Sequence, residues 1–150
     1  MKKFLLVLSL LFLALAMVSC GKSGEFGRGN VMKLTFSTNP STGFDWQYEF
    51  LSGEDRAQIV LDKEEYHMNE NLDLVGAPSR RTYYFVAKKE GKQNLTFTYK
   101  RPWEGGETAY DVVYELSVDK NLKISCLSKM KGTVESDKEL SFFPNPEFVD

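Results

Sequence analysis

Apolar and polar residues alternate in one segment of the chain after another. Between residues 44 and 50, Phe44, Trp46, Tyr48 and Phe50 alternate with polar neighbours, and this spacing gives a β-strand one apolar face. Comparable segments recur roughly every 10 to 15 residues, and none has a sustained helical period. The pattern predicts an all-β chain folded as an antiparallel β-sandwich.

The alternation locates the individual strands. We expect them at residues 31–38, 44–51, 58–68, 80–88, 93–100 and 109–119. Residues 121–127 either extend the last strand after a turn or form a strand of their own. Residues 89–92 contain Gly91 and are predicted to be a hairpin turn.

The first 19 residues have the composition of a signal peptide. Lys2 and Lys3 precede an apolar run from Phe4 to Ala16, which as a helix of ~20 Å is short of the ~30 Å hydrocarbon core of a membrane. We therefore interpret residues 1–19 as an export signal rather than a membrane span. The small residues directly before Cys20 resemble the lipobox of bacterial lipoproteins, with Met17 in place of the usual leucine. This resemblance implies cleavage before Cys20 and a lipid on its sulfur; the alternative is ordinary secretory cleavage.

Residues 20–30 are rich in glycine and polar residues, and we interpret them as a flexible tether. If Cys20 carries a lipid, Cys126 has no cysteine partner. Cys126 alternates with Leu122 and Ile124, so we expect a buried, unreactive thiol. Residues 128–150 begin as a polar tail, and residues 140–146 either dock on the sandwich or stay loose.

Charge and residue types exclude several functions. The chain has 19 basic and 21 acidic residues, a formal net charge of −2, which gives no indication of a nucleic-acid partner. It has one histidine, His67, and no cluster of residues at metal-ligand spacing, so we expect no cofactor, metal or catalytic residue. An enzymatic pair of Cys126 and His67 is a weak alternative.

A second alternative is a surface lipoprotein that binds carbohydrate or protein. Its stacking platform would use Tyr83, Tyr84, Trp103 and Phe142. Strand alternation places Tyr83 and Tyr84 on opposite faces, so at most one of them can take part.

Three loops carry a more specific pattern. Asn39-Pro40-Ser41-Thr42-Gly43-Phe44-Asp45-Trp46 reads alone as a stiff connection into a strand, because Pro40 fixes φ and Gly43 permits a positive φ. Together with Gly76 and Arg101-Pro102-Trp103, in this order and spacing, it resembles the chagasin family of cysteine-peptidase inhibitors. The resemblance covers about residues 31–127 and implies an immunoglobulin-like β-sandwich with the three loops at one end.

The resemblance implies a wedge that inhibits papain-like cysteine peptidases. Residues 39–43 would enter the active-site cleft, flanked by residues 72–79 and 101–107. The implied peptidase-binding residues are Asn39, Pro40, Ser41, Thr42, Gly43, Phe44, Gly76, Ala77, Arg101, Pro102 and Trp103. Trp103 is the expected anchor, although it could instead pack on its own sandwich, whereas Trp46 is expected in the core.

The chain departs from the family pattern in two places. Gly76-Ala77-Pro78-Ser79 stands where the family has Gly-x-Gly-Gly. Pro78 has no amide donor and resists the φ values that glycine allows, so we expect the middle loop to contact its target differently. The family also has a strand before residue 31, and we hypothesise that residues 128–150 fill that sheet edge. We expect a monomer, exported and held by its lipid on the bacterial cell envelope, either on the outer membrane or facing the periplasm.

Overall fold

Nine antiparallel strands form the part of the chain that the structure, a computed structural model, describes, which is residues 26–68 and 78–150. The strands are β1 Arg28–Gly29, β2 Val31–Thr38, β3 Asp45–Phe50, β4 Ile59–His67, β5 Ser79–Ala87, β6 Gly91–Lys100, β7 Thr108–Val118, β8 Ile124–Lys131 and β9 Glu147–Val149. Three short 3-10 turns lie at Pro40–Thr42, Glu54–Arg56 and Leu140–Phe142. The described ranges contain no α-helix, and none of their helical turns is long and apolar enough to cross a membrane.

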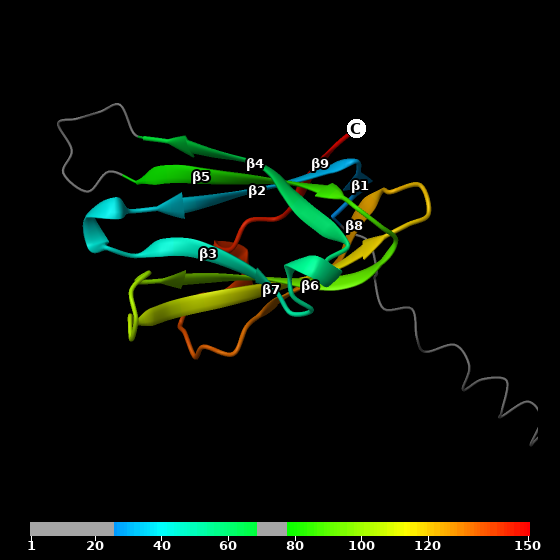
Figure 1. The fold of residues 1–150 in the computed structure, drawn as a ribbon. Coiled ribbons are helices and arrows are strands. Elements are labelled where there is room, and N and C mark those ends of the chain that lie inside the picture. Colours follow the sequence, from blue (N-terminus) through cyan, green and yellow to red (C-terminus); the bar gives the residue numbers. More distant parts are fainter. Residues whose placement is uncertain (1–25, 69–77) are drawn as a thin grey trace, which may run out of the picture.

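The strands make two sheets that face each other, one in the order β1-β8-β7-β6-β3 and the other in the order β4-β5-β2-β9 (Figure 1). Alternate residues of both sheets point inward, including Met32, Leu34 and Phe36 as the sequence predicts. Aromatic rings dominate the core, and Phe97 contacts both Phe36 of one sheet and Tyr114 of the other. The predicted all-β sandwich is therefore confirmed.

The prediction of a hairpin at residues 89–92 is wrong. β5 and β6 belong to different sheets, and the chain crosses between them there. The amides of Lys88 and Lys89 both donate to the carbonyl of Gln58, and the Gln93 side chain accepts from the Gln58 amide at 2.6 Å. The burial of the apolar faces of β5 and β6 in the core outweighs the local turn signal from Gly91.

The segment after β7 also differs from expectation. Leu122 does not alternate with Ile124 and Cys126; it lies exposed in a turn with φ of 58°. The Asp119 carboxylate closes that turn by accepting from the amides of Asn121 and Lys123. β8 is thus a separate strand paired with β7, and it runs to Lys131, beyond the expected domain end at residue 127.

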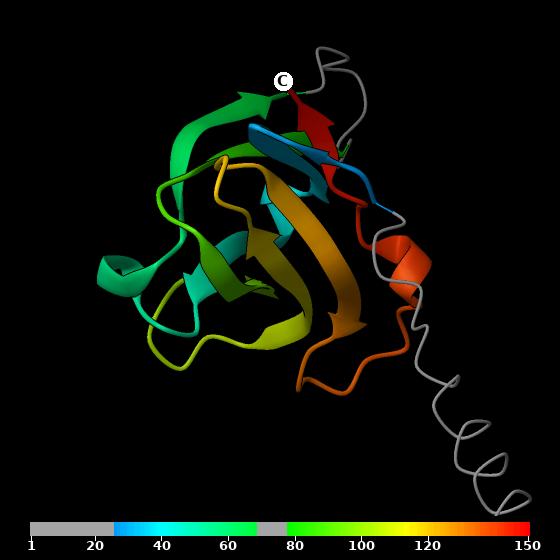
Figure 2. The ribbon, with the colours of Figure 1, turned by 90° about the vertical axis from the view of Figure 1, so that its right-hand side faces the viewer.

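The C-terminal segment docks on the sandwich. β9 pairs with β2 at Met32↔Phe148 and forms the edge of the β4-β5-β2-β9 sheet (Figure 2). Phe143 is 2% exposed and belongs to the core. The Tyr114 hydroxyl donates to the Pro144 carbonyl at 2.7 Å, and Lys129 donates to the Phe143 carbonyl at 2.9 Å.

Candidate functional site

Residues 39–43, which we call the finger, connect β2 to β3 at one end of the sandwich, which we call the finger pole (Figure 1). Pro40 begins a 3-10 turn and Gly43 ends it with φ of 74°. The Asn39 side chain accepts from the Ser41 amide at 3.2 Å and from the Ser41 hydroxyl at 2.6 Å. The Thr42 hydroxyl donates to the Asn39 carbonyl at 2.7 Å. Asn39 and Thr42 therefore each close a side-chain turn onto the backbone, whereas the Ser41 hydroxyl bonds to a side chain.

Trp103 lies against the finger. A Cβ built on Gly43 would come within 3.3 Å of Cη2 of the Trp103 indole, so this ring packs directly over the glycine. Trp103 is nevertheless 55% exposed. The ring is therefore supported by the finger on one side and open to solvent on the other, and it does not pack into the core of its own sandwich.

Arg101 lies between two aromatic rings. Its guanidinium carbon is 4.8 Å from the centre of the Phe44 ring and 5.7 Å from that of Trp103. Its Nη1 is also 3.9 Å from Glu107. Cation–π contacts of this kind hold the guanidinium over both rings, so Arg101 links the 101–107 loop to the residue that follows the finger.

The 101–107 loop is closed by its own backbone. The Arg101 amide donates to the Glu107 carbonyl at 3.0 Å, and the Gly106 amide donates to the Trp103 carbonyl at 2.9 Å. A side chain on Gly106 would collide with the Arg101 carbonyl. Pro102 is exposed on this loop. The finger and residues 101–103, far apart in sequence, thus meet at the finger pole.

The base of the finger rests on core aromatics. The Phe44 and Tyr99 rings stack at 5.4 Å, and the Tyr99 hydroxyl accepts from the Asn39 amide at 3.4 Å. Trp46 is buried as expected, and its indole nitrogen donates to the Ser37 carbonyl at 2.9 Å. Both ends of the finger are therefore tied to buried rings.

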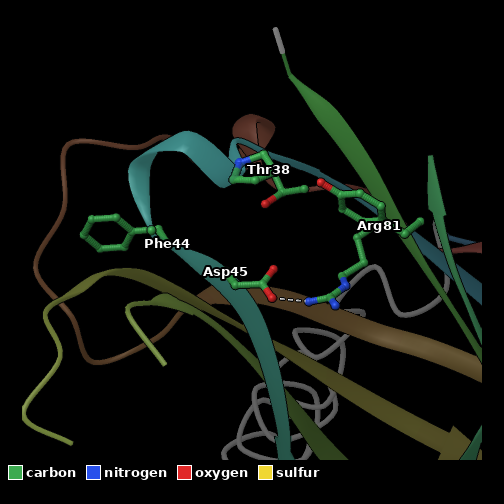
Figure 3. A pocket seen from close by; sticks show the side chains of 7 residues that line it. Thr38, Phe44, Asp45 and Arg81 are labelled. Atoms are coloured by element: carbon green, nitrogen blue, oxygen red, sulfur yellow. Dashed lines mark hydrogen bonds and ion pairs between the residues drawn. The ribbon is translucent and has the colours of Figure 1, made fainter. Parts of the chain in front are cut away.

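A pocket of about 320 Å³ opens on one flank of the finger (Figure 3). An ion pair between Asp45 of β3 and Arg81 of β5 crosses from one sheet to the other within it. The Arg81 Nε is also 2.6 Å from Glu64 of β4. The lining residues are Thr38, Pro40, Gly43, Phe44, Asp45, Tyr66 and Arg81.

The electrostatics of this pocket favour the charged guanidinium. Burial lowers the pKa of Arg81, but Tyr83, Asp45 and Glu64 together raise it above its ordinary value. Burial has the opposite effect on the neutral Tyr83, whose pKa it raises. The Tyr83 hydroxyl donates to the Trp46 carbonyl at 3.0 Å and so forms a second link between the sheets. Sequence reasoning missed these links because ion pairs between sheets have no local sequence signal.

Gly76 and Ala77, most of the predicted 72–79 flank, and Cys20 lie outside the described residues. The strand ends on either side of residues 69–77 do lie at the finger pole, since Ser79 pairs with Thr38 and His67 pairs with Arg80.

The two alternative sites do not assemble. Tyr83 is buried, which leaves Tyr84 for a carbohydrate platform. The Tyr84 hydroxyl donates to Glu65 within the β4-β5-β2-β9 sheet, whereas Phe142 packs on Tyr110 of the other sheet. Cys126 is buried in β8 of one sheet, whereas His67 is exposed at the end of β4 in the other. Burial raises the pKa of the Cys126 thiol to about 11, so it is not an activated nucleophile. Within residues 26–68 and 78–150, no group of three or more His, Cys, Asp or Glu side chains could hold a metal ion.

Comparison with known proteins decides the family. The model of the family described as "Chagasin family peptidase inhibitor I42" matches residues 26–118, more than half of the chain. The chain belongs to the chagasin family. It is accordingly a peptidase inhibitor rather than an enzyme.

Two relatives and one solved structure agree with this family. Chagasin of Trypanosoma cruzi is 27% identical over 77 residues, which are 51% of this chain and 70% of chagasin. Amoebiasin-2 of Entamoeba histolytica is 32% identical over 78 residues, which are 52% of this chain and 61% of amoebiasin-2. The crystal structure of the cysteine protease inhibitor EhICP2 from Entamoeba histolytica superposes with a TM-score of 0.51 at 27% identity, over 61% of this chain and 80% of that chain. The chagasin-family match ends at residue 118, so β8, the 3-10 turn Leu140–Phe142 and β9 lie beyond it.

Proposed function

We propose that this chagasin-family chain is a reversible, tight-binding inhibitor of papain-like cysteine peptidases. The finger enters the active-site cleft, residues 101–107 contact one wall and residues 72–79 the other. The observation that carries this proposal is the packing of the exposed Trp103 ring over Gly43 of the finger. A cleft wide enough to receive the finger then also meets a large aromatic surface, the commonest kind of binding hot spot.

Internal order of the finger supports tight binding. Its turn is closed by Asn39, Thr42 and the amide of Gly43, which donates to the Pro40 carbonyl at 3.1 Å. Little freedom is left to lose on binding, and preorganisation of this kind raises affinity. A nanomolar complex needs about 12 kcal/mol of net binding free energy, which a standard-size interface with good hot spots supplies.

The proposed inhibition requires no chemistry from this chain. The finger occupies the cleft and excludes water and substrate. Its closed turn presents no extended peptide bond in a geometry that the peptidase's thiolate could attack, so the finger stays uncut. The partner is therefore a papain-like enzyme held through protein–protein contact alone.

We also propose that the mature chain is exported and held at the cell envelope by a lipid on Cys20. The described domain begins near β1, which pairs with β8 at the end of the sandwich opposite the finger, which we call the far pole (Figure 1). β2 spans the eight residues from there to the finger, or about 26 Å at ~3.3 Å per residue. An anchor at the N-terminal end would thus leave the finger pole facing away from the membrane.

Titration of the mature chain against a panel of papain-like peptidases tests the proposed inhibition. We expect reversible inhibition with nanomolar constants and an uncleaved chain after prolonged incubation. Trp103→Ala should raise the inhibition constant at least about tenfold, or 1.4 kcal/mol, without unfolding the domain. Leu51→Ala, an exposed side chain at the far pole, is the matched control. Absence of inhibition across the panel would refute the proposal.

The lipid is tested separately in the cell. The wild-type chain should fractionate with membranes and incorporate labelled fatty acid, whereas Cys20→Ser should do neither. If Cys20→Ser remains in the membrane fraction, the anchor is not the lipid on this residue.

A further inference from the structure

A row of aromatic rings connects the C-terminal segment to the finger. Phe142 meets Tyr110 edge-on with the ring centres 5.2 Å apart. Tyr110 stacks on Tyr99 at 5.1 Å with an interplanar angle of 11°, and Tyr99 stacks on Phe44 at 5.4 Å. Phe44 is the residue directly after the finger. The row therefore starts on a segment near the C-terminus and ends at the proposed binding loop.

The same segment supports a second path through the core. Phe143 meets the Trp46 ring edge-on at 6.4 Å and also lies 6.0 Å from Tyr110. Trp46 in turn lies 5.0 Å from Tyr99. Tyr99 is where the two paths join, and its hydroxyl accepts from the Asn39 amide at the start of the finger.

The segment that carries Phe142 and Phe143 is held at several points. Lys129 donates to the Phe143 carbonyl and, at 2.6 Å, to the Asn145 side chain. The Tyr114 hydroxyl donates to the Pro144 carbonyl, and Lys33 pairs with Glu147 at 3.1 Å. A segment fixed in this way can restrain the rings that rest on it.

Most of this support lies outside the part that the family match covers. The match ends at residue 118, and the C-terminal contacts come from residues 129–147. Tyr110 and Trp46 are inside the match, but each contacts a ring beyond it: Tyr110 contacts Phe142 and Phe143, and Trp46 contacts Phe143. Tyr99 depends on that support indirectly, through Tyr110 and Trp46. The C-terminal segment is therefore positioned to restrain a loop that it does not touch.

We propose that residues 140–145, which we call the brace, are a positioning element for inhibition: they hold Tyr110 and Trp46, and through Tyr99 they hold the finger in its binding shape. This inference rests on the proposed function of the finger. Phe142 and Phe143 act through other residues and need not contact the peptidase. Loss of the brace loosens the finger, so binding has to order it again and affinity falls.

Phe142→Ala tests the brace with little risk to folding, because this side chain is 47% exposed. Leu140→Ala is the matched control, since Leu140 lies in the same 3-10 turn, is 37% exposed and makes no aromatic contact in the row. A third variant, Val118→Ala, weakens the core at the far pole. Phe142→Tyr keeps the ring and should restore wild-type behaviour.

Two measurements are made on each variant of the mature chain. The first is hydrogen exchange of the Thr42 and Gly43 amides, which close the finger turn. The second is the inhibition constant for papain. In Phe142→Ala we expect both amides to exchange at least about threefold faster and the inhibition constant to rise about threefold to tenfold, which is 0.7 to 1.4 kcal/mol. Leu140→Ala and Val118→Ala should leave both quantities unchanged.

Unchanged amide exchange in Phe142→Ala would overturn the brace. Equal changes in Phe142→Ala and in the far-pole variant would also overturn it, because they would show a general loss of stability. Failure of the proposed function is distinguishable: the wild type would then not inhibit papain, while the exchange measurement would still decide whether the brace orders the finger.

Discussion

The Trp103 ring packs over Gly43, a residue whose φ of 74° favours glycine and whose missing side chain leaves room for the indole. One contact thus joins two loops separated by sixty residues of sequence. Because the ring stays more than half exposed, the pair forms a continuous surface that a partner can cover.

This relationship predicts the effect of Gly43→Ala. Alanine at this position has to adopt a left-handed backbone conformation, which costs about 1–2 kcal/mol. Its Cβ also presses on the Trp103 indole. Gly53→Ala is the control, since Gly53 has φ of 79° and nothing within 4 Å of its Cβ position. We expect both variants to lose unfolding free energy in urea, Gly53→Ala at least as much because its ψ of 157° lies in a region that only glycine readily adopts. The inhibition constant should rise several-fold only for Gly43→Ala. Equal inhibition by both would mean that the Gly43–Trp103 contact has no part in binding.

The ion pair between the sheets predicts a stability effect. Arg81→Ala leaves the partly buried carboxylates of Asp45 and Glu64 without their guanidinium partner. We expect a loss of about 1–3 kcal/mol in unfolding free energy, measured by urea denaturation. Arg80→Ala removes an exposed arginine from the outer face of the same strand and should cost less than about 0.5 kcal/mol. If the two variants are equally stable, the pair does not hold the sheets together.

The buried Phe143 ring of the C-terminal segment predicts a second effect on stability. Phe143→Ala removes a fully packed side chain and should cost about 3–5 kcal/mol. The adjacent, half-exposed Phe142→Ala should cost far less. Thermal unfolding of the two variants measures the difference. A wild-type melting temperature for Phe143→Ala, or for a chain lacking residues 128–150, would show that the docked segment contributes nothing to the fold.

The Cys126 thiol gives a pH-dependent prediction. Burial raises its pKa from 9.0 to about 11, so the thiol stays protonated at pH 8 and iodoacetamide should not modify it in the native domain. The unfolded thiol ionises first as the pH rises, so this group's contribution to stability is complete below pH 9 and is lost as the pH approaches 11. Mass spectrometry of Cys20→Ser with and without urea measures the modification. Rapid alkylation of the native chain would contradict the buried position of Cys126.

Strand positions could be predicted from sequence because each strand has one buried face. The alternation in residues 31–38 predicts β2 to the residue, and the buried position of Trp46 follows from the same pattern. The turn chemistry of Asn39, Pro40 and Gly43 likewise predicts a closed loop, since it depends on neighbours in sequence.

Contacts between distant segments could not be predicted in this way. Gly91 looks like a hairpin residue, but its φ of 138° serves a crossover packed against Gln58. β9 is three residues long and leaves no periodic signal. The Arg81–Asp45 pair and the packing of Trp103 on Gly43 depend on how the sheets stack, which the local pattern does not encode.

Access to the peptidase's catalytic cysteine tests the central claim most directly. Papain is mixed with the Cys20→Ser chain at about 100 times Kd, and the rate of alkylation of the papain cysteine by iodoacetamide is measured. We predict a rate about a hundredfold lower than for free papain, in proportion to the unbound fraction. Thr42→Glu, which places a charge on the finger, should restore the free rate at the same concentration. An undiminished alkylation rate in a fully bound wild-type complex would contradict the insertion of the finger into the cleft.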